Sequence, residues 1–106
     1  MGSAWQILHR AGLPLFGRRT GPVPDIADMA RAVLEILDGE QLAPGPERDA
    51  LAAFLLGWHH EWPTSFAGAF GADAERVAGW AAERIDDRNR YIKLRRIAIA
   101  NLAHVL

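Results

Sequence analysis

The stretch GWHHEWPTSF at positions 57–66 gathers side chains whose types could do chemistry: two adjacent histidines, a glutamate and two tryptophans. Imidazoles and carboxylates bind zinc or act as general acids and bases. On a helix, however, His59 and His60 point about 100° apart, so they cannot easily hold the same metal ion. No HExxH motif is present, and His9 and His104 are isolated. We therefore expect no metal, no cofactor and no catalytic residue here.

A structural role for this cluster is the interpretation we favour. Its tryptophans continue a series of large apolar residues at three- and four-residue steps, which is the spacing of one helical face. The series is Leu51, Phe54, Leu55, Trp58 and Trp62. We expect the tryptophans in the core and the histidines beside it. The alternative is a partner-binding surface, because tryptophan is a typical interface anchor. That surface would include His59, His60 and Trp62.

A row of arginines marks the C-terminal third of the chain. If residues 84–95 are helical, steps of four, three and four residues place an arginine stripe on one face, which we define as Arg84, Arg88, Tyr91 and Arg95. Apolar residues such as Ile99 and Leu102 share this side, and arginine cannot lose its charge to suit them. Three arrangements would accommodate the charges of the stripe. Its arginines could pair with the acids Asp28, Glu35 and Asp38, their guanidinium ends could be solvated, or they could contact another chain or an anionic ligand.

Charge is spread unevenly, although the net charge is only −1. Residues 76–106 hold seven bases against three acids, whereas residues 25–75 are mainly acidic. Either these segments pack against each other or the basic one meets an anionic partner. The segment Arg84–Arg96 has the electrostatic character of a nucleic-acid footprint, interrupted by Asp86 and Asp87. Lys93 is the only lysine and alanine is abundant, a bias typical of a high-GC bacterial or phage genome.

Helix signals along the chain position these residues. Residues 4–11 predict a short helix that ends at Gly12, followed by an irregular connector to residue 24. Asp25 is a suitable N-cap for a helix over 25–38, and Pro46 begins a helix that Pro63 ends. A short capped turn is expected through residues 64–70. Residues 73–106 as one helix would be about 51 Å long, too long for a compact domain, so we expect a break or kink near 86–89.

The expected fold is therefore all-α: a single compact bundle of four to five helices, antiparallel through short loops, with a long C-terminal helix that breaks or kinks. We divide the chain into an N-terminal part, 1–24, and a helical domain, 25–106. Residues 97–106 are apolar nearly all round, which favours a central core helix over a homo-oligomer seam. The chain has no cysteine, no signal peptide and no apolar run of about 20 residues, so we expect a cytoplasmic protein with no membrane contact.

Together these features predict a small non-enzymatic helical protein that acts by protein–protein binding, of the inhibitor, immunity, antitoxin or adaptor type. Its expected partner-binding residues are Arg84, Arg88, Tyr91, Arg95, His59, His60 and Trp62. The alternative is a small nucleic-acid-binding regulator that uses the Arg84–Arg96 segment.

Overall fold

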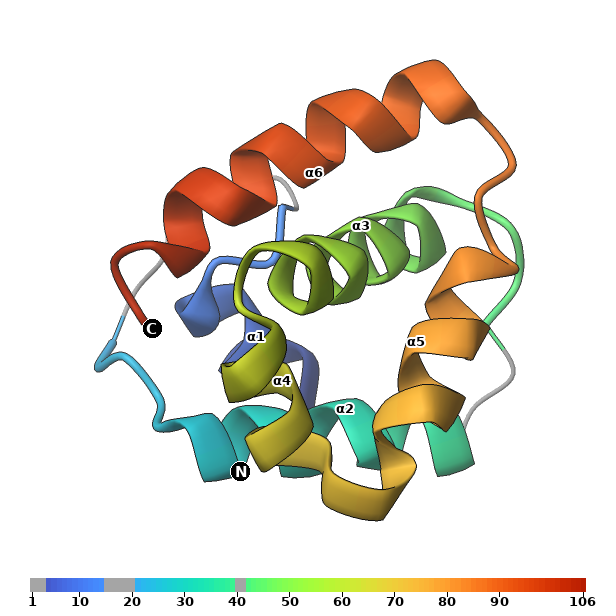
Figure 1. Cartoon of the computed structure of the whole chain (residues 1–106). Helices are drawn as coiled ribbons and strands as arrows, with labels where there is room; N and C mark the ends of the chain where they lie inside the picture. Colours follow the sequence, from blue (N-terminus) through green and yellow to red (C-terminus); the bar gives the residue numbers. More distant parts are fainter. Residues whose placement is uncertain (1–3, 15–20, 40–41) are drawn as a thin grey trace.

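The structure, a computed structural model of the chain, describes residues 4–14, 21–39 and 42–106. These residues form six α-helices, one turn of 3-10 helix (Gly71–Asp73) and no strand, which confirms the all-α prediction (Figure 1). The helices are α1 (Ala4–Ala11), α2 (Ile26–Gly39), α3 (Pro46–Glu61), α4 (Pro63–Phe70), α5 (Ala74–Ala82) and α6 (Arg88–Leu102). Helix α4 replaces the short turn expected after Pro63. Positions 15–20 of the predicted connector lie outside the described residues.

Helix α3 is the centre of the fold. Every residue from Asp49 to Trp58 is buried, and α4, α5 and α6 all pack against this helix. In Figure 1, α6 crosses above α3 and α2 lies below it. The sequence explains this position, because residues 50–58 carry no charge on any side. The radius of gyration is 12.3 Å, close to the value of about 13 Å typical of 100 residues.

The interpretation of residues 97–106 as a central core helix is wrong. Within α6 only Ala98 and Leu102 are buried, and Ile97 is 50% exposed. The five bases of α6, which has no acid, keep much of this helix at the surface because a buried cation needs a partner. The C-terminal helix therefore packs on α3 along one side only.

Helices α3 and α6, which are not consecutive in the chain, run in the same direction. Arg90 near the start of α6 pairs with Asp49 near the start of α3. Arg95, farther along α6, reaches His60 near the end of α3. Helices α4 and α5 connect them, and they return the chain from the end of α3 to the level of its start. Gly57 permits a close approach here, because a Cβ at this position would lie 3.2 Å from Cγ1 of Ile99.

The predicted break in the C-terminal segment is confirmed. Helix α5 ends at Ala82 and α6 begins at Arg88. Asp87 is extended, with φ −117° and ψ 105°, and its carboxylate accepts a hydrogen bond of 3.1 Å from the backbone N–H of Arg90. Asp25 caps α2 in the same way, accepting from the N–H of Asp28 at 2.8 Å. Such caps satisfy N–H groups that have no partner inside the helix.

The end of α1 is held by Gly12, which has φ 110°. The N–H of Gly12 donates to the carbonyl of His9 and the N–H of Leu13 donates to that of Leu8, the two bonds of a Schellman motif. The side-chain amide of Asn101 donates to the Gly12 carbonyl at 2.9 Å. These contacts fasten α1 to the end of α6.

Replacing Gly12 with alanine is expected to lower the free energy of unfolding by about 2 kcal/mol, because an L side chain is strained at this φ and its Cβ would lie 2.4 Å from Cβ of Asn101. Gly79→Ala is the matched control. Gly79 lies within α5 and nothing lies near the position of an added Cβ, so we expect a gain of about 1 kcal/mol. Urea unfolding followed by circular dichroism measures both. Equal stability of Gly12→Ala and the parent would refute this account of the α1 end.

Candidate binding surface

Trp58, from the cluster at 57–66, is a core residue. It is fully buried, and its ring meets those of Phe54, Phe66 and Phe70 at centroid distances of 6.2, 5.7 and 5.2 Å. Its indole N–H donates to the hydroxyl of Ser65 at 3.0 Å, so the one polar atom of the ring is satisfied. Trp62 differs, since it lies half-buried at the junction of α3 and α4. The structural interpretation therefore holds for Trp58.

The two histidines face different surroundings. His59 is half-buried, with its ring edge-on to Phe66 at 4.9 Å and its Nδ1 buried without a hydrogen-bond partner among the described residues. His60 is exposed. Partial burial of the imidazole, together with His59 and Arg95, lowers the pKa of His60 from its usual value of 6.5, and Glu61 opposes this shift. The described ranges contain no group of three His, Asp or Glu side chains able to hold a metal ion.

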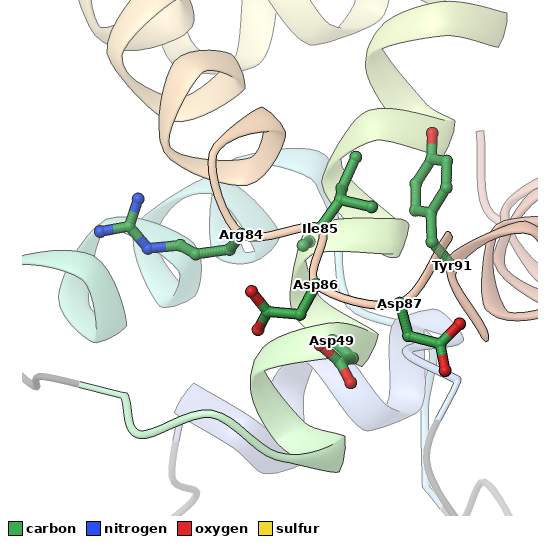
Figure 2. Close-up of a pocket in the computed structure, with 7 residues that line it drawn as sticks. Asp49, Arg84, Ile85, Asp86, Asp87 and Tyr91 are labelled. Carbon is green, nitrogen blue, oxygen red and sulfur yellow. The ribbon is translucent and has the colours of Figure 1, made fainter. Parts of the chain in front are cut away.

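Arg84 does not belong to the α6 face on which the arginine stripe was predicted. It lies in the turn after α5, where its guanidinium sits 4.7 Å from the ring centroid of Trp80 and donates to the Trp80 carbonyl at 3.1 Å. In Figure 2 the Arg84 side chain extends to the left, whereas Tyr91 lies on the right, above Asp87. The break before α6 removes Arg84 from the helical register.

The other three residues of the stripe lie on α6. Arg88 is exposed, whereas Tyr91 and Arg95 are half-buried. The guanidinium of Arg95 lies 5.9 Å from the Tyr91 ring centroid and 3.2 Å, through Nη1, from Nδ1 of His60. The structure thus brings together Tyr91, Arg95 and His60, three of the residues predicted to bind a partner.

Pairing of the stripe with the acids of α2 is wrong. Asp28 pairs with Arg31 on its own helix, and Asp38 pairs with Arg76 of α5 at 2.8 Å. Within the described residues no ion pair joins a stripe arginine to α2: Arg84 pairs with Glu83, and α6 packs mainly on α3. Of the three arrangements considered for the stripe arginines, two remain for Arg88: a solvated guanidinium or a contact with another molecule.

Two ion pairs that the sequence analysis missed attach the start of α6 to the start of α3. Arg90 donates to the carboxylate of Asp49, the one charged side chain that is buried among the described residues, and this bond raises the pKa of Arg90 above its usual value. Arg48 donates to Asp86 at 2.6 Å. A shallow hollow beside this network is lined by Asp49, Arg84, Ile85, Asp86, Asp87 and Tyr91, among others (Figure 2).

The surface of α6 that faces away from α3 has a different character. It carries exposed cations and large apolar residues spread over half the circumference of the helix, at 100° per residue. We call this surface the outer half of α6, and it consists of Arg88, Ile92, Lys93, Arg96 and Ile97. Within the described ranges, no carboxylate pairs with Arg88, Lys93 or Arg96. Ile92 and Ile97 are 43% and 50% exposed.

A second surface feature is an open groove of about 390 Å³ between the start of α2 and α4. It is lined by Ile26, Ala27, Thr64, Ser65, Gly68 and Ala69. These lining residues include no charged or nucleophilic group other than two hydroxyls. The groove therefore offers contact area but no chemistry of the acid–base kind.

The fold and this surface define a small all-α protein with one strongly basic, partly apolar helix exposed. Comparisons of the chain with known protein families, with curated proteins and with solved structures find no match. None of the helices in the described part of the chain has the length and apolarity needed to cross a membrane.

Proposed function

We propose that the protein is a non-enzymatic binding domain and that the outer half of α6 contacts another protein whose surface is acidic and partly apolar. The observation that supports this most is the set of three cations, Arg88, Lys93 and Arg96, for which the described residues supply no carboxylate. Complementary charge at an interface steers association and excludes wrong partners. An acidic partner would supply the missing anions.

The two isoleucines favour a protein over a nucleic acid. Ile92 and Ile97 are among the few large apolar residues exposed in the described part of the chain, and both lie on the outer half of α6. Apolar residues next to cations match the apolar centre and polar rim of protein interfaces, whereas protein–nucleic acid interfaces are more polar. The alternative, a nucleic-acid-binding regulator, has support in the five bases and no acid of α6. It is tested by the same experiment.

The experiment captures partners from host-cell extract on the immobilised full chain and then measures the affinity of the purified partner for two charge reversals. We expect Arg96→Glu to weaken binding about tenfold, because it places a like charge opposite an acidic partner. Arg31→Glu is the matched control, since Arg31 is 75% exposed on α2, away from α6. It should change affinity by less than about twofold.

Equal losses from the two reversals would contradict an interface on α6. Capture that disappears on nuclease treatment, with an affinity that falls steeply with salt, would replace the protein partner by a nucleic acid.

A further inference from the structure

Arg95 of α6 and His60 of α3 are in contact beside the outer half of α6. Nη1 of Arg95 lies 3.2 Å from Nδ1 of His60. Arginine has only donors, so Nδ1 of His60 must accept, and the proton of the neutral imidazole is on Nε2. This contact needs a neutral His60, and burial, His59 and Arg95 all lower the pKa of His60. This arrangement is unusual for a solvent-exposed histidine, whose usual pKa lies close to physiological pH.

Arg95 uses little of its hydrogen-bonding capacity. A guanidinium has five N–H donors in a planar fork that fits a carboxylate in a bidentate manner. Within the described ranges, Arg95 pairs with no carboxylate, and its contacts are His60 and the Tyr91 ring. The pair lies beside the outer half of α6, since Arg95 is one helical turn beyond Ile92. A partner that covers Ile92 therefore reaches Arg95.

We infer that Arg95 and His60 form a binding site for one carboxylate side chain of the partner protein, and that filling this site takes up a proton on His60. The inference rests on the proposed function. A carboxylate is a stronger acceptor than a neutral imidazole, because hydrogen bonds between charged groups are about twice as strong as neutral ones. The incoming carboxylate replaces Nδ1 of His60 as the acceptor of the Arg95 N–H. Nδ1 of His60 then binds a proton from solvent and donates it to the same carboxylate.

The charged groups around His60 determine the sign of the pH dependence. Burial lowers the pKa of His60 most, His59 on α3 and Arg95 on α6 lower it further, and Glu61 raises it. Helix α4, which packs against His59, has no titratable side chain. Adding a carboxylate raises the pKa of His60 in the complex above its lowered value in the free protein. Binding then tightens as the pH falls through this window, by up to about tenfold per pH unit for one proton.

The test uses a synthetic helical peptide of leucines and glutamates as the probe, because glutamate stays ionised well above its pKa of about 4.3. Fluorescence anisotropy gives its affinity for the full chain at about pH 8 and about pH 6. We expect binding at least about fivefold tighter at the lower pH. His60→Gln keeps an acceptor for Arg95 but does not titrate, so its affinity should be the same at both pH values. His104→Gln, at an exposed position outside the site, should behave like the parent.

Four results would overturn the carboxylate site: equal affinity of the parent at both pH values, parent-like pH dependence in His60→Gln, no peptide binding at all, or tighter binding of a DNA oligonucleotide than of the peptide. The first three leave the proposed function intact if the captured partner still depends on Arg96. Loss of that dependence on Arg96 is the separate result that would overturn the proposed function.

Discussion

Replacing Trp58 with alanine is expected to lower the free energy of unfolding by about 4 kcal/mol, the largest effect of any single substitution proposed for this protein. Trp58 is fully buried on the central helix and touches aromatic rings from α3 and α4. Its removal leaves a cavity among rings that cannot easily move into it, since they are held by their own helices. A domain of this size has about 5–15 kcal/mol of stability in total. Urea unfolding should show the loss as a lower midpoint.

Three variants separate the parts of this effect. Trp58→Phe keeps a ring but loses the hydrogen bond to Ser65, and we expect a loss of about 2 kcal/mol. Ser65→Ala removes only the acceptor and should cost about 1 kcal/mol. Trp62→Ala, at the half-buried junction of α3 and α4, should cost less than Trp58→Ala. A larger loss from Trp62→Ala would show that the centre of the core has been misplaced.

Replacing both Ile92 and Ile97 with serine is expected to weaken partner binding about 100-fold, because each isoleucine contributes apolar area that the partner buries. In the free protein both side chains are about half exposed, so the free energy of unfolding should fall by less than about 1 kcal/mol for each. A large loss of affinity with a small loss of stability distinguishes an interface residue from a core residue. Calorimetry with the captured partner and urea unfolding measure the two quantities.

Val23→Ser is the matched control for this pair. Val23 is 57% exposed and precedes α2, so it is a large exposed apolar residue that is not part of α6. Its replacement should leave the affinity unchanged. If Val23→Ser weakens binding as much as the double variant does, the partner contacts the α2–α4 side of the protein and not α6.

The parts of the fold that could be predicted are those with local signals. Asp25, Pro46 and Pro63 each act on the helix beside them, and the structure places helix ends at all three. The break before α6 followed from length alone, and Asp87 supplies its cap. The central position of α3 was missed because an apolar run at 97–106 had the same appearance. Only the packing shows that the uncharged run at 50–58 is the buried one.

The site was harder to predict, because its contacts join residues far apart in the chain. Arg95 and His60 were both expected at a partner surface, but their contact, between residues 35 positions apart, has no local signal. The same is true of Arg90 and Asp49, which are 41 positions apart. Arg84 was misplaced because the stripe assumed one continuous helix through residues 84–95. A break of a few residues means that residues before it no longer share the helical faces of α6.

Methyl NMR of the full chain bound to its captured partner tests the central claim most directly. The partner protons are saturated, and the loss of signal is read at the isoleucine δ1 methyl groups. The account predicts strong transfer to Ile92 and Ile97 of α6 and little to Ile26 of α2 or to the buried Ile36. Transfer to Ile26 without transfer to Ile92 and Ile97 would contradict it, because the partner would then occupy the groove between α2 and α4.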